Sequence, residues 1–276
     1  MRKVPHGIKS HYRYKAIASM RVAVKFAYYG KRFYGYARQP NLKTVEGEII
    51  KTCFEKKIFR EIKEARIRSS SRTDKGVSAL CNIIAFNSIK DIDEIIPSIT
   101  SNLTDIIPYG IAEIDEDFNI RYAKLRHYRY YLPKEDRDVD RIKENANLFI
   151  GIHDFTNFAR IEDNKNPVRE IRDIYVSEDK DFIIFDFYAQ TFLWHQIRRI
   201  ISAIIKMEKG TISKKDIMAA FEKPHIRIDY GVAPAEPLIL MDIQYDNLSF
   251  KIYSKLYEEC RDIEYKVRAG SKYLSF

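Results

Sequence analysis

Two stretches with period-two alternation of apolar side chains, each followed by a helical pattern, constrain the fold of this chain most. In RVAVKFAYY (21–29) every second side chain is apolar, which is typical of a half-buried strand. LRHYRYYL (125–132) alternates in the same way, with aromatic rings on both faces. Thr44 can cap a helix after the first strand, and another helix is predicted at 138–148 after the second. The pattern therefore predicts two α+β halves that join near residues 108–118.

Further strands and helices continue this order, and the predicted fold class is α+β. The helix after Thr44 has an apolar stripe made of Val45, Ile49, Cys53, Phe54 and Ile58. Further strands are predicted at 65–68, 82–87, 168–176, 181–189 and 238–245. Three further helices are predicted: one that begins near Asp91, one at 192–209 and one at 213–222. We divide the chain into an N-terminal extension (1–19), an N-terminal α+β half that contains Asp74 (20–114), and a C-terminal α+β half with a C-terminal tail (115–276).

The N-terminal region is strongly basic. The formal net charge of the chain is +9, and eleven Lys or Arg residues precede the first acid, Glu46. A segment of one sign attracts a polyanion, although a solvated basic tail explains the charge equally well. Aromatic side chains alternate with cations in YYGKRFYGYARQ (28–39), and such rings can stack on bases. The combination favours nucleic-acid binding.

The chain lacks the sequence patterns of several other function classes. GxxxxGK[ST], GxGxxG, HExxH and GxSxG are absent, which argues against phosphoryl transfer, dinucleotide binding, zinc hydrolysis and serine hydrolysis. Cys53, Cys81 and Cys260 are too far apart for a zinc or CxxC motif, so we expect reduced thiols in a cytoplasmic protein. No apolar run reaches the roughly 18 residues of a membrane span. Any chemistry should therefore depend on carboxylates, tyrosines and arginines, without a cofactor or a metal.

Asp74, in SSSRTDKGVSAL (69–80), has two interpretations. An aspartate two residues before a glycine is typical of an Asx turn, in which the carboxylate only accepts a backbone N–H. The same position, between two predicted strands and beside Arg72, would also suit a reactive carboxylate that a substrate can reach. The turn pattern alone leaves both interpretations open.

The inward face of the helix in FLWHQIRRIISAI holds a second candidate, Arg198. A buried arginine needs a carboxylate partner, and Asp74 is one candidate among several acids. Arg199 is predicted to face outward, toward solvent or phosphate. Tyr128 and Tyr130 are either core aromatics or ligands for bases, and the basic residues around their strand make base stacking plausible.

Together these motifs resemble the tRNA pseudouridine synthase A family along essentially the whole stretch 21–245. The most specific element is SRTDKGVSA, which is similar to the family signature around its catalytic aspartate, (G/A/S)RTDxGV(H/S)A. Seven further segments resemble family motifs in the same order: YYGKRFYGYARQ, TVEGEI, NLTDIIPYGI, FNIRYAKLRHYRYYL, DFTNFA, FLWHQIRRI and APAEPLIL.

The resemblance implies a role for five residues. Asp74 would be the essential aspartate, Tyr128 the tyrosine that stacks on the target uracil, and Arg198 the arginine that pairs with the aspartate. Arg72 would help to hold the flipped-out nucleotide, and Arg121 would contact RNA. The resemblance also implies two ferredoxin-like halves that merge into one large, mainly antiparallel sheet flanked by helices, with the active cleft between them. Its substrates would be uridines at about nucleotides 38 to 40 of the tRNA anticodon arm, without a cofactor, and bacterial members are homodimers.

Some positions depart from the pattern of bacterial family members, and none of them has a catalytic role in the resemblance. They affect the N-terminal loop and the sheet surface, where the RNA site is shaped, and therefore bear on which uridines are chosen. Lys75 and Ser78 replace alanine and histidine, as in the archaeal and eukaryotic branch, and the other departures are Tyr29, Tyr36, Ala37, Cys81 and Arg199.

Two other functions remain possible on the sequence alone. A non-catalytic tRNA-binding protein or RNA chaperone needs only the basic and aromatic surface. A carboxylate-dependent nuclease would need clustered acids, and Asp74 has no acidic neighbour between Arg66 and Ser88. For the synthase, the pattern leaves three roles open to Asp74: attack on C1′, attack on C6, or removal of a sugar proton.

Overall fold

The structure is a computed structural model that describes residues 19–163, 165–274 and 276. The predicted N-terminal extension therefore lies outside the described residues, apart from residue 19. The elements of the N-terminal half are β1 (Met20–Tyr28), a short 3₁₀ helix (Gly30–Arg32), α1 (Val45–Glu55), β2 (Arg68–Ser69), β3 (Ser78–Ser88), α2 (Ile92–Thr100) and β4 (Ile106–Glu113).

The remaining elements follow from residue 125 onward. They are β5 (Leu125–Pro133), α3 (Val139–Asn147), β6 (Gly151–Asp154), a 3₁₀ helix (Thr156–Phe158), β7 (Val168–Ile171), β8 (Asp173–Glu178), β9 (Phe182–Ala189), α4 (Gln196–Glu208), α5 (Lys214–Glu222) and β10 (Leu238–Gln244). The tail adds β11 (Lys251–Ile252), α6 (Ser254–Glu259) and α7 (Arg261–Ser271).

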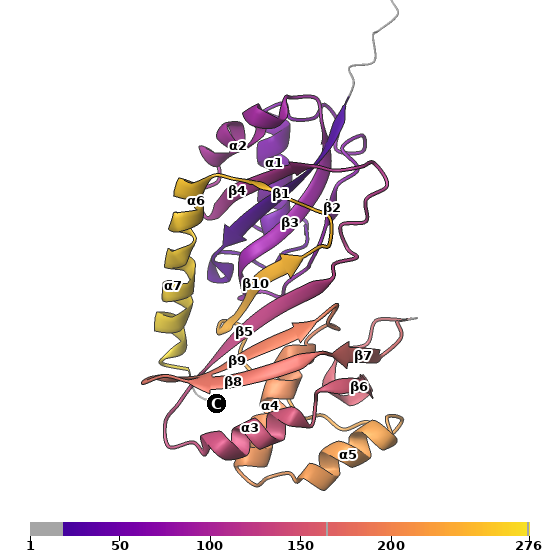
Figure 1. Ribbon diagram of the computed structural model, residues 1–276, viewed down its shortest axis with the longest axis vertical. Helices are drawn as coiled ribbons and strands as arrows, with labels where there is room; N and C mark the ends of the chain where they lie inside the picture. Colours follow the sequence, from indigo (N-terminus) through magenta and orange to yellow (C-terminus); the bar gives the residue numbers. More distant parts are fainter. Residues whose placement is uncertain (1–18, 164, 275) are drawn as a thin grey trace, which may run out of the picture.

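A nine-stranded, mainly antiparallel sheet runs through the described residues and confirms the predicted α+β fold (Figure 1). Its main path is β11-β4-β1-β3-β10-β5-β9-β8, and β2 pairs with β3 off this path. The N-terminal elements thus have the strand order β4-β1-β3-β2, and the C-terminal elements β10-β5-β9-β8, which is the same ferredoxin-like order twice. The two halves join where β10 runs parallel to β3, with Ile239 opposite Ser78.

Local sequence signals explain most element boundaries. Thr44 caps α1, as predicted, by accepting a hydrogen bond from the Gly47 N–H. Phe54, however, does not belong to the buried stripe of α1 and is 51% exposed. It follows Val45 by nine residues, and at about 100° per residue this places it on the opposite side of the helix.

Three predicted elements begin or end elsewhere because the backbone conformation changes. Arg66 has a φ of 45°, which excludes an extended strand over 65–68, and only β2 forms. The predicted helix at 192–209 begins later, at Gln196, because His195 before it is left-handed with a φ of 63°. The predicted strand at 168–176 is two strands, of which β7 pairs with β6 and β8 with β9.

Helices cover both faces of the sheet, and β5 contributes side chains to both. Tyr128 and Tyr130 belong to the main hydrophobic core, whereas Tyr131 packs in a separate cluster with Val267 of α7. In Figure 1, α6 and α7 run along one side of the sheet from the N-terminal to the C-terminal half. The tail is therefore part of the fold and spans the junction between the halves.

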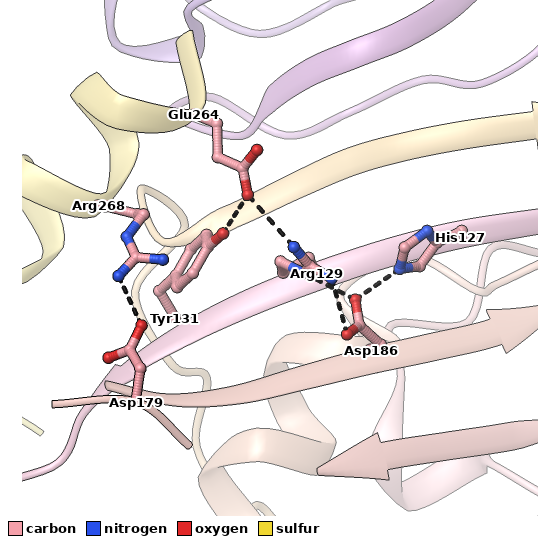
Figure 2. Close-up of polar contacts among 7 residues, drawn as sticks. All are labelled: His127, Arg129, Tyr131, Asp179, Asp186, Glu264 and Arg268. Carbon is pink, nitrogen blue, oxygen red and sulfur yellow. Dashed lines mark hydrogen bonds and ion pairs between the residues drawn. The ribbon is translucent and has the colours of Figure 1, made fainter. Parts of the chain in front are cut away.

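Polar contacts fasten α7 to β5 and to the turn before β9 (Figure 2). Glu264 accepts a hydrogen bond from the Tyr131 hydroxyl and another from Arg129 Nη1 at 3.3 Å. Arg268 pairs with Asp179 at 2.6 Å and stands over the Tyr131 ring, 5.1 Å from its centre. In the described part of the chain, no helix is both long and apolar enough to cross a membrane.

Candidate active site

A cleft of about 830 Å³ lies where the two halves meet. Its walls come from the N-terminal half on one side and the C-terminal half on the other. The lining residues fall within 34–39, 69–77, 121–128 and 191–198, together with Glu162, Lys165 and Leu238. All five residues to which the resemblance assigns a role, Arg72, Asp74, Arg121, Tyr128 and Arg198, line this cleft.

The loop that carries Asp74 is a tight turn between β2 and β3. The Asp74 carbonyl accepts a hydrogen bond from the Val77 N–H at 3.2 Å, and Gly76 has a φ of 90°, where a side chain would be strained. Thr73 is anchored through its side chain to the buried Tyr28 hydroxyl at 2.8 Å. The turn therefore holds the backbone of Asp74 rigidly.

The Asp74 carboxylate does not form the Asx turn, since it accepts no local backbone N–H among the described hydrogen bonds. Instead, Oδ2 accepts from Arg198 Nη1 at 2.9 Å and Oδ1 accepts from the Trp194 indole at 2.9 Å. His195 Nε2 lies 3.4 Å from Oδ2. Arg198 and Trp194 both belong to the opposite wall, so the Asp74 carboxylate connects the two halves across the cleft.

Arg198 and His195 differ in how they can serve this carboxylate. Arg198 is held by a second hydrogen bond, from its Nε to the Ala233 carbonyl at 2.7 Å. Burial lowers the pKa of His195 below its ordinary value, and the nearby charge of Arg198 lowers it further, against the opposing effect of Asp74. His195 is therefore neutral at neutral pH, and Arg198 is the charged partner of Asp74.

Tyr128 lies in β5 at the floor of the cleft and is 8% exposed. Phe192 packs against its ring edge to face, with the ring centres 5.3 Å apart. Burial raises the pKa of Tyr128 to about 12, although the charge of Arg126 and a hydrogen bond to Ser71 oppose the shift. The phenol is therefore protonated at neutral pH and can act as a hydrogen-bond donor.

Cations surround the mouth of the cleft. Arg72, Lys75 and Arg121 are exposed there. Lys75 stands over the Tyr34 ring at 4.5 Å, and Arg160 over the Trp194 ring at 4.2 Å. In the described segments, no group of three or more His, Cys, Asp or Glu side chains could hold a metal ion. The arrangement suits an anionic, aromatic ligand such as a nucleotide.

The sequence analysis missed three residues of the site and misplaced one. Trp194 and His195 lie in FLWHQIRRI, directly before Arg198, but only the fold shows that both face Asp74. Arg126 is one of the basic residues around the strand of Tyr128, and the sequence did not indicate that it is buried in the wall of the cleft. Arg199 does not point to solvent, since it pairs with Asp229 at 2.8 Å and its side chain is 19% exposed.

The family model and the curated relatives that match this chain all belong to the tRNA pseudouridine synthases. A family model described as "tRNA pseudouridine synthase" matches residues 146–246. Curated relatives named "tRNA pseudouridine synthase A" include one from Thermococcus sibiricus, with 42% identity over 84% of this chain and 88% of the relative. Others come from Pyrococcus horikoshii, with 39% identity over 90% of this chain and 94% of the relative, and from Methanothermobacter thermautotrophicus, with 36% identity over 90% of both.

Proposed function

Since this chain belongs to the tRNA pseudouridine synthase A family, we propose that it isomerises uridine in the anticodon arm of tRNA, with Asp74 as the essential nucleophile or base. The target nucleotides are those at about positions 38 to 40. The observation that carries the proposal is the Asp74 carboxylate, which lies in the cleft between the halves with Arg198 at 2.9 Å. A carboxylate with one fixed cationic partner and access to a cleft is suited to covalent or acid–base chemistry.

The reaction breaks the N1–C1′ bond of uridine and joins C5 of the turned base to C1′. C5 loses a proton and N1 gains one, so atoms and electrons balance without an oxidant or a reductant. Attack on C1′, attack on C6 and removal of a sugar proton all need a free oxygen of the Asp74 carboxylate. Arg198 occupies Oδ2, which leaves Oδ1, now bonded to Trp194, as the oxygen that an incoming nucleotide can reach.

The target base must leave its stack in the RNA, which costs a few kcal/mol. Tyr128 would offset part of this cost, because stacking of a base on an aromatic ring contributes about 1 to 3 kcal/mol. Arg72 would hold the flipped-out nucleotide, and Arg121 would contact the RNA backbone. Their exposure at the mouth of the cleft supports these roles.

Mapping of pseudouridine on unmodified tRNA tests the proposal. The wild-type protein should form pseudouridine at about positions 38 to 40, and Asp74→Ala should bind the same tRNA without forming product. A non-catalytic RNA-binding protein or chaperone would bind tRNA and form no product in either case. Product confined to another arm of the tRNA would contradict the proposed position while leaving the reaction intact.

We also propose that the protein is a cytoplasmic homodimer, as the resemblance to bacterial family members and the reduced cysteines suggest. Within each chain, we place the boundary between the two halves after residue 114. Cys53, Cys81 and Cys260 are all buried and free, which suits a reducing compartment. Sedimentation at micromolar concentration would test the oligomeric state, and a single 33-kDa species would contradict it.

A further inference from the structure

Arg126 is a buried arginine that the proposed reaction does not use. It lies in β5, two residues before Tyr128, and is 6% exposed. Its Nε donates to Ser71 Oγ at 2.9 Å, and its Nη2 donates to the Ser70 carbonyl at 3.0 Å. The same Nη2 donates to the Arg121 carbonyl at 2.9 Å, and Nη1 donates to the Gln190 carbonyl. One guanidinium therefore joins three separate chain segments.

Arg126 differs from the two arginines of α4 beside the site, because no carboxylate pairs with it among the described residues. Arg198 pairs with Asp74, and Arg199 with Asp229. Burial lowers the pKa of Arg126 below its ordinary value against the opposing effect of Tyr128 and Tyr245, and no carboxylate contributes. A buried cation without a counter-charge is unfavourable unless its hydrogen bonds are well satisfied. The four neutral oxygens that accept from Arg126 must therefore stabilise its charge.

The three joined segments carry the proposed site residues. Ser70 and Ser71 lead directly into Arg72 and Asp74 in the N-terminal half. The Arg121 carbonyl belongs to a residue on the opposite wall. Gln190 precedes the segment 191–198, which contains Trp194 and Arg198.

Resting on the proposed function, we propose that Arg126 is a positioning residue that sets the distance between Asp74 and the opposite wall of the cleft. It acts through the backbone of Ser70, Arg121 and Gln190 and does not touch the reacting atoms. The planar fork of arginine can reach all of these acceptors in one plane, whereas the single ammonium of lysine cannot. Arg126→Lys therefore keeps the positive charge but cannot form all of these hydrogen bonds at once.

The test compares Arg126→Lys with Arg21→Lys, a matched control. Arg21 is also 6% exposed, and it donates to Asn87 at 2.8 Å and to the Arg66 carbonyl at 3.2 Å, but it does not line the cleft. We expect Arg126→Lys to lower the single-turnover rate on a tRNA transcript by about 10- to 100-fold, because small misplacements of reacting groups have effects of this size. The dissociation constant for tRNA should change by less than about 3-fold in both variants.

A rate for Arg126→Lys within about 2-fold of wild type, or a loss no larger than that of Arg21→Lys, would overturn the proposal. If Arg126→Lys does not fold, Ser71→Ala removes the hydrogen bond that Arg126 Nε donates, and with it the bond between Ser71 and Tyr128. Tyr128→Phe removes only the second of these bonds, so Ser71→Ala should lower the rate by about 3-fold or more beyond Tyr128→Phe, and a rate no lower would also overturn the proposal.

A readout without catalysis separates this proposal from the proposed function. Trp194 is the sole tryptophan, and it lies four residues after Gln190. Acrylamide quenching of its fluorescence should rise in Arg126→Lys and stay unchanged in Arg21→Lys. If the wild type forms no pseudouridine, the proposed function fails, and the quenching result still decides whether Arg126 holds the segment. Equal quenching in all three proteins would contradict the positioning role.

Discussion

Asp74 and Asp186 each contact one arginine and one histidine, but Asp74 lies in the open cleft and Asp186 is buried. Asp74 pairs with Arg198 at 2.9 Å, with His195 at 3.4 Å, and its side chain is 21% exposed in the cleft. Asp186 in β9 accepts two hydrogen bonds from Arg129, at 2.8 and 3.0 Å. It also contacts a histidine, His127, at 2.5 Å, and its side chain is only 6% exposed (Figure 2).

The difference between these two carboxylates lies in what covers them. Glu264 of helix α7 supplies a second acid to Arg129, the arginine that binds both oxygens of Asp186 (Figure 2). Asp74 has only one oxygen bound by an arginine, and its other oxygen faces Trp194, which is 41% exposed. A carboxylate locked by a bidentate arginine serves the scaffold, whereas one with a displaceable neutral partner can react. If the proposed function holds, the same residue types serve stability on one face of β5 and chemistry on the other.

The largest effect is expected from Asp74→Asn. Asparagine keeps the shape of the side chain but cannot act as nucleophile or base, so the single-turnover rate should fall by about 10³-fold or more. The midpoint of thermal unfolding should fall less than in Asp186→Asn, because the Asp74 side chain is 21% exposed and that of Asp186 6%. A variant that keeps more than a tenth of the wild-type rate would contradict the proposed role of Asp74.

Asp186→Asn is the matched counterpart on the other face of the sheet. It leaves Arg129 and His127 without their shared acid, and the loss of one partner from a buried pair lowers the free energy of unfolding by about 3 kcal/mol. Denaturant unfolding measures this loss. The rate per folded molecule should stay within about 2-fold of wild type, and a rate that falls as far as in Asp74→Asn would remove the distinction between the two carboxylates.

Trp194→Phe sharpens the account of the exposed oxygen. Phenylalanine keeps a ring beside Arg160 but loses the indole N–H that donates to Asp74 Oδ1. Since a hydrogen bond contributes about 1 kcal/mol net, we expect a change of about 3- to 10-fold in the single-turnover rate. In the wild type, tRNA should change the Trp194 fluorescence as the indole leaves Oδ1, and an emission that does not respond to bound tRNA would contradict this displacement.

The smallest effect concerns the pH dependence of stability. Burial raises the pKa of Asp186, but hydrogen bonds from His127 and Arg129 outweigh burial and leave the pKa below its ordinary value. A carboxylate with a lowered folded pKa stabilises the protein above its unfolded pKa of about 3.9, and this contribution disappears as the pH falls through the folded pKa. The difference in unfolding free energy between wild type and Asp186→Asn should therefore be constant above about pH 5 and shrink below about pH 4. Urea unfolding across this pH range measures the difference. A difference at pH 3 to 4 as large as the one above pH 5 would argue against the lowered pKa.

Much of the fold could be predicted because it depends on local patterns. Period-two alternation located β1 and β5, and the Thr44 cap located α1. The errors arose where a local pattern has no information about the backbone or the neighbours. The left-handed His195, for example, delays the start of α4. For the tail after Asn247 the sequence made no structural prediction, and it forms β11, α6 and α7.

The candidate site was predictable in its members but not in its contacts. The resemblance named Asp74, Tyr128 and Arg198, and all three line one cleft. The contacts of Arg126 and Trp194 could not be predicted, because their partners lie in segments that are distant in the sequence. Trp194, for example, is separated by 120 positions from the aspartate that it contacts.

The sequence by itself determined most of the strand and helix order up to residue 245, the family, and the presence of a turn around Asp74. These features follow from backbone preferences and side-chain periodicity over a few residues. Only the tertiary structure decided which arginine pairs with which acid, and which carboxylate is left with an accessible oxygen. The physical reason is that the energy of a charge depends on its burial and its partners, and both are set when β3 and β10 bring the two halves together.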